Sequence, residues 1–281
     1  MSFDLKAMIL DNTQYVSGFV NKEDDYVISA SMVANDPLQN YLAIVHGKPT
    51  ETDINDATLG TIFHRGMEQI VLDEIESKQE SGTPSEIVGA EVAMHTKLAN
   101  GWVLSGTADL ITASIDDFIE IHDYKLTKNY TRKMMDKEIH THAYTKQLQV
   151  LDALVHDNMG TIGVNAINGD ITLIADFFLK DSKAINHEPT HSPLQAPNKI
   201  GTEDMSATEV LFGEVIAITD SLQSYIESGQ VPPACADTWP RSVKGKVVHT
   251  RCELYCSHGK AGNCPHYQPS TGQTVSRLTN W

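Results

Sequence analysis

The chain has 281 residues, and its 41% hydrophobic and 21% charged content is ordinary for a soluble globular protein with one large domain or two small ones. No run approaches the roughly 18 apolar residues that a membrane-spanning helix needs, and the N-terminus lacks a secretory signal. We therefore expect a cytoplasmic protein with no membrane partner. The formal net charge of −16 argues against a general nucleic-acid binder, because contacts to phosphates need Lys and Arg.

The N-terminal part is predicted to lead from a polar arm into helices. Residues 1–25 are polar and acidic, and we expect them to form a loosely docked arm. Extended backbone is predicted over 26–31, and Ser31 is the expected N-cap of a helix that ends at Gly47. A second helix is predicted over about 59–77.

Three strands are predicted in the middle of the chain, over 86–96, 102–113 and 118–126. Asn100-Gly101 is a strong hairpin signal between the first two. Helices on both sides of these strands indicate an α/β core, with a central mixed sheet flanked by helices.

The rest of the chain is predicted to contain a helix, two strands, a long breaker-rich loop and a last helix, over residues 128–154, 163–167, 171–179, 181–205 and 206–228. The loop is either an active-site flap or disordered. The expected organisation is thus an arm over 1–25, a core over 26–230 and a cysteine-rich tail over 231–281.

The most informative residues lie in two of the predicted strands. Asp109 ends the run Ser-Gly-Thr-Ala-Asp over 105–109, and Asp123 and Lys125 end the run Glu-Ile-His-Asp-Tyr-Lys over 120–125. Two Asp on neighbouring strands make a hard-oxygen site for Mg²⁺ or Mn²⁺. Alternation places Asp123 and Lys125 on one face, where the ammonium would orient a water and neutralise charge on a phosphate. This arrangement suits metal-assisted cleavage of a phosphodiester.

In their order these segments resemble the nuclease core of the PD-(D/E)xK superfamily, in the branch of the RecB nuclease domain and the CRISPR-associated exonucleases. The shared pattern is a helix His, a Glu, a Gly-x-x-Asp, an Asp-Tyr-Lys and a Gln in the next helix. Here it falls on His64, Glu91, 106–109, 123–125 and Gln147. The resemblance covers about residues 26–182, and we expect it to extend to the tail. It implies a restriction-endonuclease-like fold and a metal-dependent DNA exonuclease that acts in DNA recombination, repair or processing.

The resemblance also implies how the metal is held. Asp109 and Asp123 would bind Mg²⁺ or Mn²⁺, and the ring of His64 and the backbone carbonyl of Tyr124 would complete the ligands.

Three further residues receive roles from the resemblance. Lys125 would position the attacking water, Glu91 would support the metal or its water, and Gln147 would contact Lys125 or the DNA backbone. The chain departs from the relatives at Leu151, where they often have Tyr four residues after the glutamine.

The cysteines lie together near the C-terminus, at Cys235, Cys252, Cys256 and Cys264. Metal ligands or free thiols are expected here rather than disulfides, because the cytoplasm is reducing. The surrounding sequence has few apolar residues, so a thiolate-bound metal would supply the missing folding energy.

The resemblance suggests a [4Fe–4S] cluster at these cysteines, since relatives often hold one with a single early cysteine and three late ones. No cysteine precedes Pro37 here, so Cys235 would have to be the fourth ligand. Zn²⁺ is the alternative, and three histidines could substitute for a thiolate in a zinc site: His249, His258 and His266. In either case the predicted role is structural.

Two basic clusters are candidates for contact with DNA, and the alternative is that both are merely solvated faces. Their members are Lys125, Lys128, Arg132, Lys133 and Lys137 after the catalytic strand, and Arg241, Lys244, Lys246 and Arg251 in the tail. The expected partners are single-stranded DNA or a duplex end and, by analogy with the family, a strand-annealing or recombination protein.

The rival interpretations are a structure-selective endonuclease with the same site, a catalytically idle binding module, and an adaptor organised by the cysteine tail.

Overall fold

The protein is represented by a computed structural model that describes residues 26–47, 56–128, 143–180, 186–190, 207–236, 238, 240–243, 246–249, 251–252 and 256–267. The described residues fall into two compact units. One draws on Met1–Ala34 and Thr52–Ile216, and the other on Asn35–Glu51 and Ala217–Trp281. No described helix is both long and apolar enough to cross a membrane.

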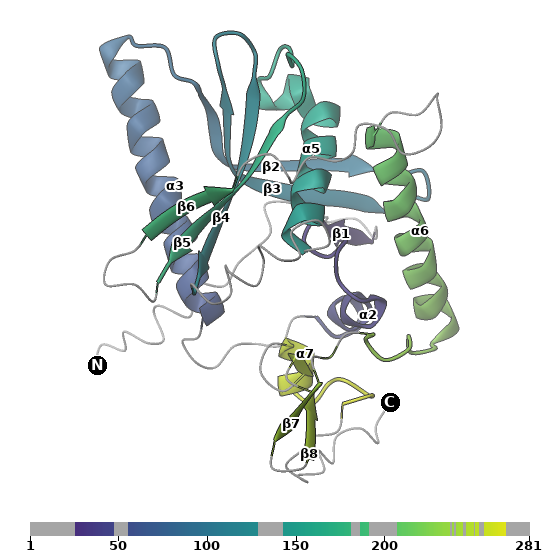
Figure 1. Ribbon diagram of the computed structural model, residues 1–281. Coiled ribbons are helices and arrows are strands. Elements are labelled where there is room, and N and C mark those ends of the chain that lie inside the picture. The colour runs from purple at the N-terminus through teal and green to yellow at the C-terminus, as the bar shows by residue number, and fades with distance from the viewer. Residues whose placement is uncertain are drawn as a thin grey trace, which may run out of the picture. The chain divides into compact units, whose positions relative to one another are not determined.

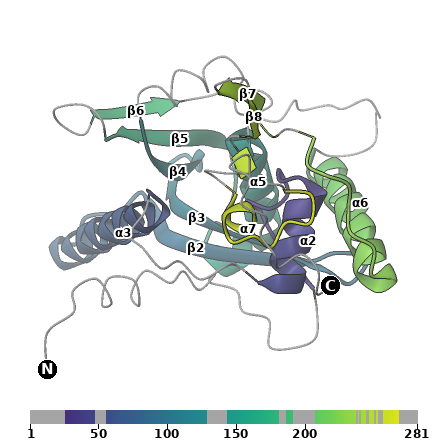
Figure 2. The same ribbon diagram turned by 90° about the horizontal axis from the view of Figure 1, so that it is seen from below.

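The first unit is built on a mixed sheet. Its strands, in chain order, are β1 Val27–Ser29, β2 Ile87–Lys97, β3 Val103–Ala113, β4 Ile119–Thr127, β5 Thr172–Leu179 and β6 Asn186–Thr190. The strand order is β1-β3-β4-β5-β6, and β2 pairs with β3. The β1–β3 and β4–β5 pairs are parallel, and the other pairs are antiparallel. Figures 1 and 2 show β4 leaving β3 and continuing beside β5.

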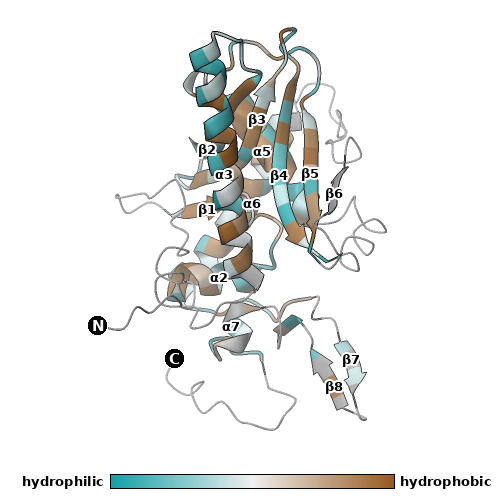
Figure 3. Ribbon diagram, turned by 90° about the vertical axis from the view of Figure 1, so that its left-hand side faces the viewer, coloured by the Kyte–Doolittle hydropathy of each residue, from teal (hydrophilic) through white to brown (hydrophobic). Residues whose placement is uncertain are grey.

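Two helices cover the opposite faces of this sheet: α3, Asp56–Ser81, and α5, Ala143–Ile162. Phe63 of α3 contacts Phe178, with ring centroids 4.7 Å apart, whereas Tyr144 of α5 faces Phe177 at 6.3 Å. Because Phe177 and Phe178 are consecutive on β5, their side chains point to opposite faces, and so the two helices lie on opposite sides (Figure 3).

Gly106 lets α5 approach β3 closely. A Cβ atom at this position would lie 2.7 Å from Leu151 and 2.8 Å from Leu154, both fully buried on α5. Any side chain would therefore push the helix away from the strand that carries Asp109. Close packing thus explains the glycine three residues before this carboxylate.

The second unit contains short elements. They are α2 Pro37–His46, β7 Pro240–Val243, β8 Lys246–His249 and α7 Ser257–Lys260, with part of α6 Ala207–Ser228, which the two units share. Asp36 is the N-cap of α2, with Pro37 in the first turn. Residues 35–51 thus group with the C-terminal residues, although the sequence placed them in the core.

The expected α/β class, with a mixed central sheet flanked by helices, is confirmed. The three central strands begin and end within one residue of their predicted limits, and Gly101 turns between the first two with φ +88°. The predicted strand over 163–167 is wrong. Gly163 instead ends α5 with φ +82°, and Asn168 bonds to the backbone of Asp116 and Asp117.

Other predicted limits also differ from the structure. The first predicted helix begins at Pro37 rather than after Ser31, because the segment between them forms turns. The described part of the predicted 128–154 helix begins at Ala143 and extends to Ile162, while residues 129–142 lie outside the described ranges. Strand β6 occupies part of the predicted 181–205 loop, and the remainder of that loop is not among the described residues.

Candidate functional site

The candidate site lies where β4 separates from β3. The two strands are paired from Ala113–Ile119 to Leu110–His122, and no further β3–β4 pair follows. Asp109 and Asp123 are the next residues on each strand. The Asp109 carboxylate accepts the Tyr124 backbone N–H at 2.5 Å. A carboxylate oxygen thus accepts the hydrogen bond that a backbone carbonyl would accept in a continuing strand pair. This bond ties Asp109 directly to the segment that carries Asp123 and Lys125.

Asp109 meets two other potential ligands, His64 from α3 and Glu91 from β2. His64 Nδ1 lies 3.1 Å from Asp109 Oδ1 and 3.9 Å from Glu91 Oε1. One ligand atom from each of the three residues lies within 4.8 Å of the other two. Opposite ligands of one Mg²⁺ ion are about 4.2 Å apart, since each bond is about 2.1 Å. The three residues therefore fit a single divalent ion.

Glu91 occupies an unusual backbone conformation inside a strand. Its φ is +47°, in the left-handed region that residues with a Cβ atom rarely adopt. The pairs Ala90–Leu110 and Val92–Ala108 continue the ladder on either side, so the distortion is local. Such strain costs about 1–3 kcal/mol, and it is found mainly where a side chain serves a binding site. Here the strained residue presents its carboxylate beside His64.

The charge state of His64 reflects these two acidic neighbours. Burial by itself lowers the pKa of the imidazole, but hydrogen bonds to Asp109 and Glu91 and the charge of Asp109 outweigh it and raise the pKa to about 10. Without a metal ion, a proton on His64 therefore balances the carboxylates. A divalent ion would replace that proton and supply the same compensation.

Asp123 has different partners. Its Oδ1 accepts hydrogen bonds from Lys125 Nζ at 2.8 Å and from Gln147 Nε2 at 3.1 Å. Its Oδ2 lies 2.7 Å from the same ammonium, but this contact lacks hydrogen-bond geometry and leaves the buried oxygen without a hydrogen-bond partner among the described residues. This oxygen thus faces the Lys125 ammonium and keeps lone-pair capacity that a metal ion could also use.

Burial dominates the ionisation of Asp123 and competes with its charged neighbours. The carboxyl is 2% exposed, and burial raises its pKa to about 6. The charge of Lys125 lowers this pKa, whereas the charge of Asp109 raises it further. Burial lowers the pKa of Lys125, but Asp123 and Tyr144 outweigh it, so the net pKa is raised. Lys125 therefore keeps its proton at neutral pH.

Tyr144 is a neighbour of Lys125 that the sequence did not reveal. The Lys125 ammonium lies 4.7 Å from the centre of the Tyr144 ring, within cation–π range. Tyr144 precedes Gln147 by three residues, so the two share one face of α5. The first turn of α5 thus holds both members of the Asp123–Lys125 pair. The sequence did contain a signal for Tyr144, because a residue three positions before the predicted glutamine shares its helix face.

The structure therefore divides the expected site residues into two neighbouring groups. His64, Glu91 and Asp109 form the close set, and Asp123 is paired with Lys125 and Gln147 rather than placed beside Asp109 in that set. Gln147 was expected to contact Lys125 or DNA and instead donates to Asp123.

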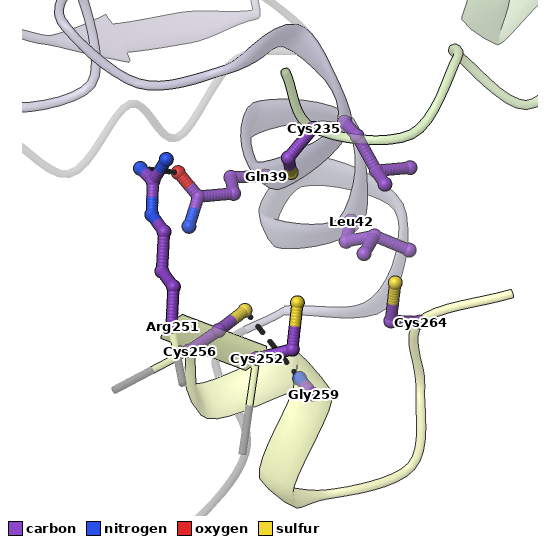
Figure 4. Close-up of a pocket in the computed structure, with 9 residues that line it drawn as sticks. Gln39, Leu42, Cys235, Arg251, Cys252, Cys256, Gly259 and Cys264 are labelled. Carbon is purple, nitrogen blue, oxygen red and sulfur yellow. Dashed lines mark hydrogen bonds between the residues drawn. The ribbon is translucent and has the colours of Figure 1, made fainter. Parts of the chain in front are cut away.

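The four cysteines of the second unit face a common cavity that Leu42 and Arg251 also line. Figure 4 shows Cys252, Cys256 and Cys264 with their sulfur atoms directed toward α2. All four are free thiols. Cys256 Sγ accepts the Gly259 N–H at 3.4 Å, and a Cβ atom on Gly259 would lie 2.3 Å from the Cys252 carbonyl oxygen. A glycine is therefore required in this turn.

The surroundings of the thiols favour their neutral form. Burial, together with the charges of Asp36 and of the neighbouring thiols, raises the pKa of Cys235 to about 12 despite the lowering effect of Arg251. Burial and Cys256 likewise raise the pKa of Cys264. Both thiols therefore keep their protons at neutral pH in the absence of a compensating cation.

The predicted basic clusters are only partly described. Lys128 is exposed at the end of β4. The guanidinium of Arg251, a candidate for contact with DNA, is bonded to Asp36 and Gln39. Arg132, Lys133, Lys137 and Lys244 lie outside the described residues, as do the side chains of Arg241 and Lys246.

The three histidines named as possible zinc ligands have different surroundings. His258 is buried, and its Nδ1 has no hydrogen-bond partner among the described residues. His249 is hydrogen-bonded to Thr238, and His266 to the Pro232 carbonyl.

Comparisons with known proteins leave the function open. No family model and no curated protein matches the sequence. Among solved structures, the chain is similar to one titled "Crystal structure of SSO0001", with 15% identity, a TM-score of 0.49, and coverage of 90% of this chain and 93% of that one. This title states no activity, and the similarity is too weak to carry functional information.

Proposed function

We propose that this protein is a divalent-metal-dependent nuclease of the PD-(D/E)xK type that removes nucleotides from DNA ends. The observation that supports it most is the convergence of His64, Glu91 and Asp109 within 4.8 Å, next to a buried Asp123–Lys125 pair. Acceptor-only carboxylates would repel a phosphate unless a cation lay between them. The two groups together thus supply a cation site and a fixed ammonium.

His64, Glu91 and Asp109 are the residues that would hold Mg²⁺ or Mn²⁺, and the buried Oδ2 of Asp123, which has no assigned hydrogen bond among the described residues, offers a fourth ligand. When bound, the ion supplies Lewis-acid stabilisation of the scissile phosphate. The imidazole suits Mn²⁺ better than Mg²⁺, because nitrogen is a softer ligand than a carboxylate oxygen.

Lys125 would act as a cation rather than as a base, because it keeps its proton at neutral pH. Its ammonium would orient the attacking water and stabilise negative charge that develops on the phosphate oxygens as the P–O bond breaks. Gln147 and Tyr144 hold this pair from α5.

For the four thiols we propose a structural [4Fe–4S] cluster rather than Zn²⁺. A tetrahedral zinc site needs sulfur atoms about 3.8 Å apart, since each Zn–S bond is about 2.3 Å. Among the described residues no three thiols fall within the 4.8 Å spacing that His64, Glu91 and Asp109 meet. Thiolates bound to separate iron atoms lie farther apart than the ligands of one ion, which fits these thiols around one cavity.

Digestion of linear and closed circular DNA by the purified protein tests the activity. We expect linear DNA to be degraded with Mg²⁺ or Mn²⁺ and to remain intact with excess chelator, while closed circles persist. Cleavage of closed circles would indicate an endonuclease and contradict the exonuclease assignment. Cleavage in excess chelator would contradict the metal mechanism, and no cleavage under any condition would indicate a binding module.

A further inference from the structure

One carboxylate links two of the cysteine-bearing segments in the second unit. Asp36, the N-cap of α2, accepts Arg251 Nη1 on Oδ2 at 2.7 Å and the Ala236 backbone N–H on Oδ1 at 3.3 Å. Arg251 immediately precedes Cys252, and Ala236 immediately follows Cys235. The two cysteines, 17 residues apart in sequence, are thus both located relative to the same side chain.

The Arg251 side chain is held at two points. Besides the Asp36 bond, its Nη2 donates to Gln39 Oε1 at 2.9 Å, in the first turn of α2 (Figure 4). The Arg251 and Asp36 side chains are each 19% exposed, so the pair is largely withdrawn from water. Fork-shaped bonding of this kind fixes the guanidinium in one orientation.

Arg251 and Gln39 also line the cavity that the four thiols face. A four-thiolate set around iron or zinc carries net negative charge, and a nearby fixed cation compensates it. Arg251 is a cation and Asp36 is an anion, and their charged groups lie 2.7 Å apart. The two members of the ion pair therefore act on the site with opposite sign.

We propose that Arg251, aligned by Asp36 and Gln39, is a positioning residue of the thiolate site. It places Cys235 and Cys252 for metal binding and supplies the positive charge that the bound group requires. This role rests on the cysteine metal centre proposed above and goes beyond it, because it assigns retention and electronic tuning of the metal to a side chain that is not a ligand.

The test uses the full-length protein purified without oxygen, and it begins with the iron and zinc content of the wild type. In Arg251→Gln we expect a chelator to remove the metal about tenfold faster or more, the usual scale for loss of a partner outside the ligands. Arg251→Lys keeps the positive charge but cannot form the two guanidinium hydrogen bonds to Asp36 and Gln39. It should therefore release metal faster than the wild type, while the reduction potential stays near that of the wild type.

The sign of the change in reduction potential separates charge compensation from simple packing. Arg251→Gln removes a cation and should make the potential more negative, whereas Asp36→Asn removes an anion and should make it less negative. Glu214→Gln, which breaks the Lys146–Glu214 ion pair, is the matched control and should change neither potential nor release rate.

Two results would overturn the proposal, and they are distinguishable. A wild type with neither iron nor zinc would refute the cysteine centre itself and this role with it. A metal-loaded wild type with potentials that shift in the same direction or not at all, and release rates like that of Glu214→Gln, would leave the centre standing and refute the role of Arg251.

Discussion

The carboxylate site and the thiol site differ in what holds their residues in place. Asp109 and Asp123 lie on strands of 11 and 9 residues, and each is below 10% exposed. The cysteines lie near elements of four residues each, β7, β8 and α7. Backbone ladders therefore position the carboxylates. The thiols depend on one glycine turn and one ion pair, so the metal proposed for them would contribute directly to folding.

The largest expected effect tests the chemistry of the carboxylate site. Lys125→Ala should lower turnover of linear DNA by about a hundredfold or more, because it removes a fixed cation that acts on the transition state. The fold should persist, since Asp123 already has a raised pKa and would take up a proton once its partner is lost.

Lys78→Ala is the control for this variant, because Lys78 forms a surface pair with Glu74 on α3. It should leave the rate unchanged in the same steady-state assay. Retention of more than about a tenth of wild-type turnover in Lys125→Ala would be too small a loss for an electrostatic stabiliser and would require another assignment of the site.

The second test concerns the dependence of the thiol site on its metal. Cys252→Ser should lose the bound iron and lower the melting temperature, while the metal-dependent activity per folded molecule stays within about twofold of wild type. Ser242→Ala in β7, a small polar change in the same unit, should retain both metal and stability. Metal analysis and thermal unfolding measure the outcome. Unchanged metal content and stability in Cys252→Ser would mean that the cysteines are unliganded thiols.

The third test uses the proton that His64 carries when no metal is bound. Its pKa is raised to about 10, so Mn²⁺ must displace a proton at neutral pH. Affinity should therefore increase with pH, by about tenfold per unit between pH 6 and 9, and become weaker as the solution is acidified. Calorimetry in buffers of different ionisation enthalpy would count the released proton.

His64→Ala should flatten this pH dependence and selectively weaken the reaction with Mn²⁺. His156→Ala, which changes a histidine paired with Asp152 on α5, should keep the wild-type slope. An unchanged slope and metal preference in His64→Ala would exclude His64 as a ligand.

The smallest expected effect concerns the backbone strain at Glu91. Glu91→Gly and Glu91→Ala both remove the carboxylate and should both lower activity, but only glycine accepts φ +47° without strain. We expect the glycine variant to be more stable than the alanine variant by about 1 kcal/mol, or roughly 2–4 °C in melting temperature. Equal melting temperatures would show that the conformation of Glu91 is not strained.

Local patterns accounted for much of the carboxylate site and little of the thiol site. Alternation and turn residues located β2, β3 and β4, because a hairpin strand obeys rules that span only a few neighbours. The strand predicted over 163–167 failed because its apolar residues follow a helix end, and the true partners of β5 are β4 and β6. Pairing across long sequence separations leaves no local signal.

By itself, the sequence determined that Asp109, Asp123 and Lys125 lie on two consecutive predicted strands, that Gly106 precedes Asp109 by three residues, and that four cysteines gather near one end of the chain. Only the tertiary structure decided which groups meet. The separation of β4 from β3 joins Asp109 to His64 and Glu91 and leaves Asp123 to Lys125, and the start of α2 draws Arg251 to Asp36. Strand periodicity depends on neighbouring residues, whereas these encounters depend on how distant segments pack together.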